Sequence, residues 1–250
     1  MMTPTISAIV TGHRERRLSI PTLRSFGNAI ADAQAQGYTV EAILCLDRPD
    51  TLTEEIFHRF APPKARILTM DHGDQGKVRN DAVVAATGQF VAFLDGDDLW
   101  QKSWLHRAAD FLIASGRDDY VAHPAYNYFF EGQATTFRQI DQDSPDFDID
   151  LLRMRNYWDA LSMAPRSIHE RFPYAHRDIP NGWALEDWQW NEETIAAGIR
   201  HKIVPDTVLF KRRQKESQHS RAAKSKATHR RNGMTSYSAP IFAAFDGPTV

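Results

Sequence analysis

Short apolar runs alternate with helix-forming segments along the first 125 residues, and this order constrains the fold more than any other feature of the chain. A sequence in which strands and helices alternate builds a largely parallel sheet with helices on its faces. The runs hold few polar residues, as expected of strands that are covered on both faces. The pattern predicts an α/β fold with a Rossmann-like, mostly parallel central sheet, whose strands are expected at 6–10, 40–46, 66–70, 90–94 and 120–123.

The pattern breaks down between residues 124 and 182, where aromatic residues, prolines and an aspartate-rich loop follow one another without a clear period. A long irregular stretch inside a domain is more often functional than structural. Beyond it, Leu185–Ala197 is expected to be a helix, and a strand is expected near Lys202–Val204.

The formal net charge of −2 conceals an uneven distribution. Residues 141–150 hold five aspartates and no basic residue, whereas residues 211–231 hold nine lysines or arginines against Glu216 alone. Such a run marks an interaction tail or a solvated charged helix. We therefore expect one domain at 1–210, followed by a basic, helical C-terminal extension at 211–250.

The chain carries a single cysteine, Cys45, within an apolar run. One cysteine excludes an intrachain disulfide and a cysteine-rich zinc site, and its setting predicts a buried, inert thiol. The N-terminus lacks the pattern of a secretory signal, and no stretch reaches the roughly 18 apolar residues of a membrane-spanning helix. The sequence predicts a cytoplasmic protein, with peripheral contact to the inner face of the membrane left open.

The sharpest chemical signal is Asp95-Gly96-Asp97-Asp98, directly after the apolar run at 90–94. In an open α/β sheet, ligands gather beyond the carboxyl ends of the strands. Three carboxylates in four residues repel each other, and Mg²⁺ or Mn²⁺ relieves that repulsion while keeping sites for phosphate oxygens. The glycine is expected to allow close approach of a ligand. The alternative is an exposed acidic turn in which Asp98 or Ser103 caps the next helix.

Two further segments point to a nucleotide. Asp47 follows the second apolar run, where its carboxylate either accepts hydrogen bonds from a base or ribose or stabilises a turn. The segment 73–80 places two glycines, Lys77 and Arg79 at a helix start, an arrangement suited to a diphosphate although it matches neither common phosphate-loop pattern.

The last chemical signal is the pair Glu186-Asp187 at the start of the helix expected at 185–197. Adjacent helical residues point about 100° apart, so the two carboxylates cannot serve the same contact. Acidic residues also stabilise the first turn of a helix, and that reading remains open beside a catalytic one.

These pieces, in this order, resemble the family 2 glycosyltransferases, which have the GT-A fold. The resemblance covers about residues 6–215 and is most specific at Arg79–Trp100, and it implies an inverting mechanism. It implies that Asp47 contacts the nucleotide base and Arg79 the nucleotide or its phosphates. It further implies that Asp95 contacts ribose or the metal-bound water, that Asp97 binds the metal, and that Asp187 is the general base.

The resemblance also divides the domain into a nucleotide-binding half at about 1–100 and an acceptor-side half at about 101–210. Lys77 is then expected near the donor diphosphate, and Lys211, Arg212 and Arg213, the basic residues nearest the domain, are candidates for the same contact. Asp95 is expected to assist Asp97 in holding Mn²⁺ or Mg²⁺, and His219 is expected as a late metal ligand, with a surface histidine as the alternative. Tyr126, Tyr128 and His123 are assigned to the acceptor side.

The function expected is transfer of a sugar from a nucleotide-diphosphate-sugar, most simply a UDP-sugar, to a glycan or lipid-linked acceptor in bacterial surface polysaccharide synthesis. The basic extension suits a phosphorylated lipid carrier or an anionic membrane; no RNA-binding signature accompanies it, so no nucleic acid is expected. Two alternatives stay open. One is a nucleotidyltransferase that makes nucleotide sugars, although the loop at 11–17 holds only one glycine. The other is a non-catalytic sugar- or membrane-binding module.

Overall fold

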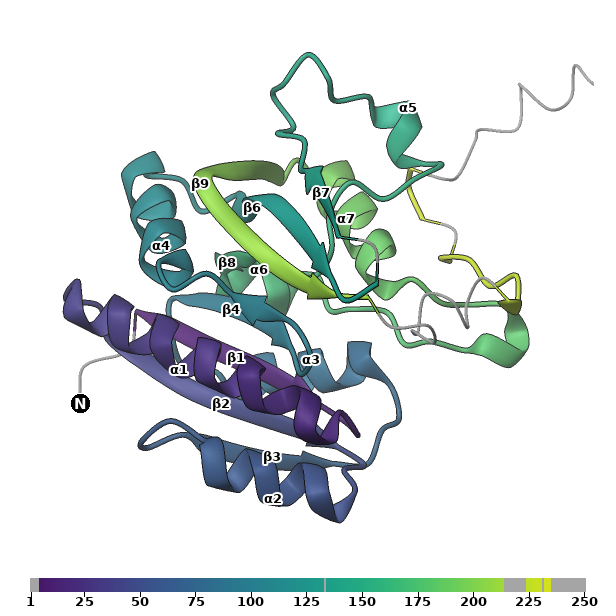
Figure 1. Cartoon of the computed structure of the whole chain (residues 1–250). Coiled ribbons are helices and arrows are strands. Elements are labelled where there is room, and N and C mark those ends of the chain that lie inside the picture. The colour runs from purple at the N-terminus through teal and green to yellow at the C-terminus, as the bar shows by residue number, and fades with distance from the viewer. Residues whose placement is uncertain (1–4, 133, 214–223, 231, 235–250) are drawn as a thin grey trace, which may run out of the picture.

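The computed structural model describes residues 5–132, 134–213, 224–230 and 232–234 (Figure 1). The strands in these ranges are β1 (Ile6–Gly12), β2 (Val40–Asp47), β3 (Arg66–Met70), β4 (Phe90–Asp95), β5 (Leu99–Trp100), β6 (Tyr120–Phe130), β7 (Thr135–Arg138), β8 (Met163–Pro165) and β9 (Arg200–Arg212). The α-helices are α1 (Ser19–Ala35), α2 (Thr51–Phe60), α3 (Gln75–Ala85), α4 (Trp104–Ser115), α5 (Ile149–Leu152), α6 (Arg166–Arg171) and α7 (Glu186–Ala196). Two short 3-10 helices, η1 (Arg16–Leu18) and η2 (Ile179–Asn181), complete the elements.

All of the described strands belong to one sheet, in the order β3-β2-β1-β4-β8-β6-β9-β5, with β7 paired to β6. The pairs β1–β2, β1–β4, β2–β3 and β6–β9 are parallel. Strand β8 runs antiparallel to both β4 and β6, so β4 and β6 run in the same direction. The carboxyl ends of β1, β2, β4, β6 and β9 therefore meet at one edge of the sheet.

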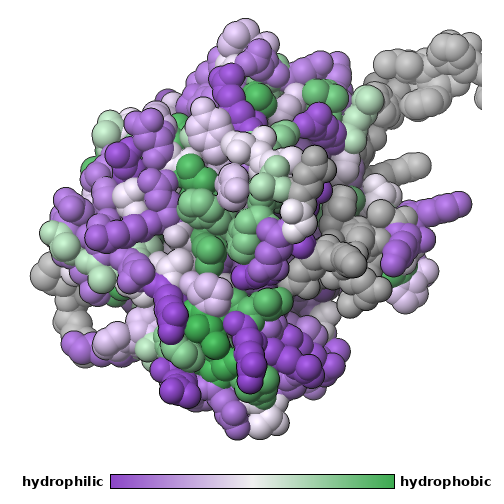
Figure 2. Space-filling model, in the orientation of Figure 1, coloured by the Kyte–Doolittle hydropathy of each residue, from purple (hydrophilic) through white to green (hydrophobic). Residues whose placement is uncertain are grey.

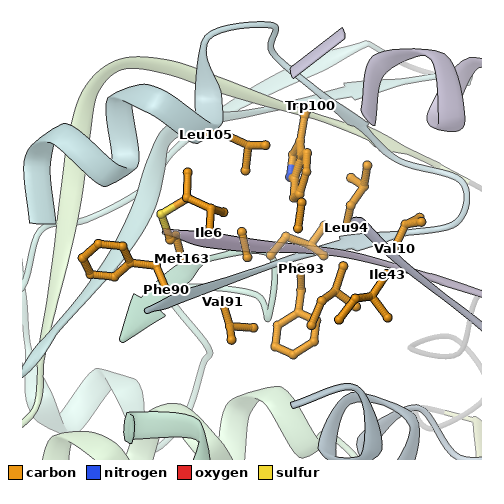
Figure 3. Close-up of a cluster of buried hydrophobic side chains, with 14 of the residues drawn as sticks. Ile6, Val10, Ile43, Phe90, Val91, Phe93, Leu94, Trp100, Leu105 and Met163 are labelled. Atoms are coloured by element: carbon orange, nitrogen blue, oxygen red, sulfur yellow. The ribbon is translucent and has the colours of Figure 1, made fainter. Parts of the chain in front are cut away.

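The core lies on both faces of β1, β2 and β4, and every residue of β1 is buried. Successive strand residues point to opposite faces. Figure 3 shows Val91 and Phe93 of β4 on one side of the sheet, and Leu94 on the other side, toward Trp100. The sheet is covered by α1, α2 and α4 on one face, and by α3 and α6 on the other (Figure 1). This confirms the predicted α/β sheet, with Cys45 fully buried in it.

The irregular stretch at 124–182 contains more regular structure than the sequence indicates. Strand β6 continues to Phe130 instead of ending near His123, and β9 is far longer than the segment expected at Lys202–Val204. Strand β8 has only three residues, yet it lies between β4 and β6 in the middle of the sheet. An element this short has no measurable period, so pattern analysis does not detect it.

Part of the C-terminal extension packs against the domain. The boundary expected after Phe210 falls inside β9, which continues through Lys211 and Arg212. Farther along, the Thr228 N–H donates to the Gly182 carbonyl at 2.9 Å, and the Ala184 N–H donates to the Thr228 carbonyl at 2.8 Å. Residues 214–223 and 235–250, with His219 among them, lie outside the described residues, and so does most of the predicted basic helix.

The face seen in Figure 2 carries apolar side chains over β6 and β9, surrounded by hydrophilic residues. A shallow hollow of about 350 Å³ on this part of the sheet is lined by Tyr126, Tyr128, Thr136, Val208 and Phe210. Among the described helices, none combines the length and the hydropathy needed to cross a bilayer.

Gly88, just before β4, allows β1 and β4 to approach each other. A Cβ there would lie 2.6 Å from the Ser7 backbone nitrogen and 2.8 Å from the Ile6 carbonyl carbon. We predict that Gly88→Ala destabilises the fold by about 1–3 kcal/mol, because the clash is with backbone that cannot move aside. Gly27→Ala is the matched control. Its Cβ would meet only the Pro62 ring at 3.9 Å, so that helical substitution should stabilise by about 0.5–1 kcal/mol. Urea unfolding of both variants measures the difference, and equal stabilities would contradict the prediction.

Candidate active site

The carboxyl edge of the sheet gathers the acidic residues that the sequence singled out. Asp47 ends β2 and Asp95 ends β4, on either side of β1. The strand register places Thr11 of β1 beside Asp95, and the Thr11 hydroxyl donates to the Asp95 carboxylate at 3.3 Å. Parallel strands bring these positions together because their ends share one edge.

A buried arginine links this edge to the start of α7. The Arg79 Nη2 group donates to Asp95 Oδ1 at 2.9 Å, and Nη1 donates to Glu186 Oε1 at 3.2 Å. The Arg79 side chain is 3% exposed and lies over the Tyr174 ring, with its Cζ 5.4 Å from the ring centroid. A buried guanidinium needs nearby carboxylates, since an unpaired charge is costly to bury. Residues 79, 95 and 186, far apart in sequence, are thereby fixed relative to one another.

The carboxylates of Glu186 and Asp187 serve different contacts, as helical geometry predicts. Glu186 is buried and binds Arg79, whereas Asp187 is half-buried and accepts a weak hydrogen bond from Asn156 Nδ2 at 3.4 Å. Leu185, just before them, has a φ of 63°, in the left-handed region that a leucine rarely adopts. Such strain is found where the surrounding structure holds functional groups in place.

The electrostatic setting of Asp187 suits a group that accepts a proton near neutral pH. Burial raises the pKa of Asp187 to about 7, and the Glu186 carboxylate adds to the rise, while the Arg79 guanidinium opposes it. A general base works best when its pKa lies near the working pH. The first-turn reading of this acidic pair, stabilisation of the helix, remains compatible with these contacts.

The acidic turn, Asp95–Asp98, has one buried aspartate, Asp98, and two half-buried aspartates, Asp95 and Asp97. Asp98 is 3% exposed, and its Oδ1 accepts the Arg212 backbone N–H at 2.8 Å. Asp97 is half-buried, and its carbonyl accepts from Arg212 Nε at 3.1 Å. Asp98 does not cap the next helix, and the Ser103 side chain forms no capping hydrogen bond either.

Gly96 meets a packing requirement that the sequence did not indicate. The sequence suggested that it allows a ligand to approach closely. In the structure a Cβ at this position would lie 2.7 Å from the Thr11 carbonyl oxygen and 3.2 Å from the Gly12 Cα. The close neighbour is therefore the end of β1 itself.

The carboxylates around this turn fit a divalent cation chemically. Burial raises the pKa of Glu15 to about 7; the His13 N–H opposes the rise, and Asp97 and Asp95 add to it. The Glu15 carboxyl lies against the acidic turn, since its Cδ would be 3.2 Å from a Cβ at Gly96. Such oxygen donors suit Mg²⁺ or Mn²⁺. In the described ranges, no three His, Cys, Asp or Glu side chains already form a metal-binding group. The metal ligands Asp97 and Asp95 stay predictions, and His219 lies outside the described residues.

Asp47 has a structural role that the sequence left open. Its Oδ1 accepts the backbone N–H groups of His72 at 2.7 Å and Gly73 at 3.1 Å, and so it holds the loop before α3. Lys77 is exposed on the first turn of α3, whose N-cap is Asp74. Arg213 is exposed, and its guanidinium lies over the Phe129 ring at 4.4 Å. The donor contacts expected of these three residues stay predictions.

On the acceptor side, the assignment of His123 is wrong. This histidine is fully buried, and it bonds His201 at 2.9 Å and stacks on Trp158, so it is part of the interior. Tyr126 and Tyr128 line the shallow hollow on β6 instead.

Several residues at this edge were missed by the sequence analysis. They are Glu15, Gln75, Asn156 and Asp159, of which Gln75 donates to Asp95 at 2.6 Å and Asp159 pairs with Lys211 at 3.0 Å. Gln75 stands in the segment 73–80 that was singled out, so its position held a signal. Asn156 and Asp159 lie in the irregular stretch and had none.

The fold matches solved glycosyltransferase structures. Over 86% of this chain and 60% of the other, it superposes on Staphylococcus aureus TarS residues 1–349 in complex with UDP-GlcNAc, with a TM-score of 0.66 and 16% identity. Over 84% of this chain and 61% of the other, it superposes on the same fragment in complex with UDP, with a TM-score of 0.62 and 17% identity. Likeness at these identities establishes the fold alone, and that fold is GT-A.

The sequence comparisons give the family. The glycosyl transferase family 2 model matches residues 8–172, so the chain belongs to this family, as the resemblance indicated. An uncharacterized glycosyltransferase of Nostoc sp. (strain PCC 7120) is 27% identical over 143 residues, which are 54% of this chain and 44% of that protein. The chain thus spans less than half the length of this relative.

Arg79 is expected to be the main electrostatic support of the site. We predict that Arg79→Met destabilises the protein by about 3–5 kcal/mol, because Asp95 and Glu186 would remain partly or fully buried without a cation. Arg117→Met is the control, since Arg117 pairs with Asp119 on the surface, with side chains 51% and 28% exposed, and its loss should leave the stability nearly unchanged. Denaturant unfolding measures both, and a stability loss in Arg79→Met no larger than in the control would refute the assignment.

Proposed function

We propose that this chain is an inverting, metal-dependent glycosyltransferase that uses a nucleotide-diphosphate-sugar donor. One observation carries the proposal. The Arg79 guanidinium joins Asp95 of the acidic turn to Glu186, the neighbour of Asp187. The residues suited to holding a sugar diphosphate and the residue suited to accepting a proton therefore belong to one site.

In this proposal Asp97, with help from Asp95, holds Mn²⁺ or Mg²⁺. The cation supplies Lewis-acid neutralisation of the leaving diphosphate. Asp47, Lys77, Arg79 and Arg213 face the donor from the strand ends and the start of α3. Support for a nucleotide-sugar donor comes from the TarS structures, which were solved with UDP-GlcNAc and with UDP. A UDP-sugar is therefore the first donor to test.

Asp187 acts on the acceptor. As its carboxylate takes the proton from an acceptor hydroxyl, the hydroxyl oxygen bonds to the sugar's anomeric carbon, and the bond from that carbon to the diphosphate oxygen breaks. The nucleoside diphosphate leaves on the opposite side, which inverts the configuration. Asn156, which donates to Asp187, orients the carboxylate. A positioned base of this kind contributes typically 10²–10⁴-fold to the rate.

The acceptor we propose is a glycan or a lipid-linked glycan of a bacterial surface polysaccharide, elongated at the cytoplasmic face of the membrane. Support comes from the basic run at 211–231, since such runs are attracted to anionic lipid and to lipid phosphates.

The first test concerns the metal. We predict that the protein releases nucleoside diphosphate from a UDP-sugar in the presence of Mn²⁺, that a chelator stops the release, and that Asp97→Ala binds the donor at least about tenfold more weakly by calorimetry. Asp118→Ala, a substitution of an exposed aspartate in the loop after α4, should behave as wild type. Unchanged donor affinity in Asp97→Ala would remove it as the metal ligand, and release of pyrophosphate from UTP and a sugar 1-phosphate would indicate a nucleotidyltransferase.

The second test concerns the base. Asp187 accepts a proton only when it is ionised, and its pKa is about 7. We predict that kcat/KM rises as the pH rises through about 7 and falls at lower pH. Asp187→Asn should retain donor binding but lose about 10²–10⁴-fold in transfer. Full turnover by this variant, or a profile that is flat between pH 5 and 8, would remove Asp187 as the base.

A further inference from the structure

Lys211 lies near the end of β9 and bridges two carboxylates from different parts of the fold. Its Nζ is 3.0 Å from Asp159 Oδ2 and 3.6 Å from Asp98 Oδ2, and its side chain is 21% exposed. In the sequence it is the first residue of the basic run, where direct contact with the donor diphosphate was the expectation. We propose that Lys211 is a positioning residue, which holds the acidic turn in the orientation that binds the donor; this inference rests on the proposed function.

Asp98 is held against β9 by its side chain. Both of its carboxylate oxygens face β9, because Oδ1 accepts the Arg212 N–H at 2.8 Å and Oδ2 faces the Lys211 ammonium. Its side chain is 5% exposed. Asp98 is thus turned into the protein and is not available to a cation at the surface of the turn. Lys211 and Arg212, which are neighbours in β9, hold the Asp98 carboxylate in this inward orientation.

Asp97, the proposed metal ligand, is held by the same strand through its backbone. Its carbonyl accepts from Arg212 Nε at 3.1 Å, so Arg212 at the end of β9 holds both the Asp97 carbonyl and the Asp98 carboxylate. Asp98 is buried in this arrangement, whereas Asp97 is half-buried. A precise ligand geometry needs supporting residues of this kind.

Asp159, the other partner of Lys211, is itself fixed by hydrogen bonds. Asp159 Oδ2 also accepts from Asn127 Nδ2 at 3.0 Å, and its Oδ1 accepts the Leu161 N–H at 3.0 Å, so the carboxylate is anchored. The same segment carries Asn156, which donates to Asp187. Lys211 therefore connects the donor-binding turn with the segment that contacts the base, and its loss should affect binding as well as stability.

Lys202 provides a matched control on the same strand. Its ammonium also bridges two aspartates, Asp141 and Asp143, and its side chain is 13% exposed. It lies at the amino-terminal end of β9, away from the acidic turn. A merely structural role for Lys211 would make the two lysines equivalent in a binding assay.

The experiment is calorimetric titration of UDP with Mn²⁺ into the full 250-residue chain and its variants. Lys211→Met should bind at least about tenfold more weakly than wild type, Lys202→Met should bind within about twofold of wild type, and Lys211→Arg should recover most of the affinity because it retains the charge. Wild-type affinity in Lys211→Met, or equal losses in both Met variants, would overturn the inference. Absence of Mn²⁺-dependent binding in the wild type would instead contradict the proposed function.

A double variant separates positioning from folding. Lys211→Met leaves two carboxylates without their cation and is expected to lower the stability. Adding Asp98→Asn removes one of those charges, which should restore part of the stability. We expect UDP–Mn²⁺ binding to stay weak in the double variant, since the clamp on the turn is still missing. Recovery of affinity in step with stability would show that Lys211 acts only through folding.

Discussion

The contact between Arg79 and the carboxylates of Asp95 and Glu186 is the interaction on which the site depends. The Arg79 side chain comes from α3, and its two partners come from β4 and α7. Asp47 holds the loop that precedes α3. Burying a guanidinium is favourable only with partners of this kind. The ion pairs of Arg79 hold the end of β4 next to the start of α7, a helix that begins almost a hundred residues later in the chain.

A second cation, Lys211, also pairs with two carboxylates, on the other side of the acidic turn. Lys211 lies between Asp98 and Asp159, and the two carboxylates raise the pKa of its ammonium despite the opposing effect of burial. One end of the acidic turn is thus held by α3 through Arg79, and the other by β9. Asp97 lies in the chain between these two attachments, at Asp95 and Asp98. The chemistry proposed for the chain therefore depends also on Lys211, a side chain that need not touch the substrate.

The strands and the acidic turn were predictable because their signals are local. Continuous apolar runs mark β1, β2 and β4, and Asp95–Asp98 follows the last of them directly. What the sequence did not reveal depends on tertiary contacts. Strand β8 is too short to have a period, and Asp159 lies in a stretch without a recognisable pattern. His123 was assigned to the acceptor side, but it is buried in the interior, and Gly96 is needed where the acidic turn packs against the end of β1. Arg79, Asp95 and Glu186 were each identified from their motifs, although the contacts between them were not.

The central claim is that the acidic turn and Asp187 serve one reaction from opposite sides of the same donor. A crystal structure with UDP and Mn²⁺ tests it most directly, because anomalous scattering locates the manganese. The account predicts a manganese peak within about 2–2.5 Å of an Asp97 carboxylate oxygen, bridging to the diphosphate, with the Asp187 carboxylate facing the open side of the nucleotide. Manganese bound away from Asp97, or a nucleotide from which Asp187 points away, would contradict it.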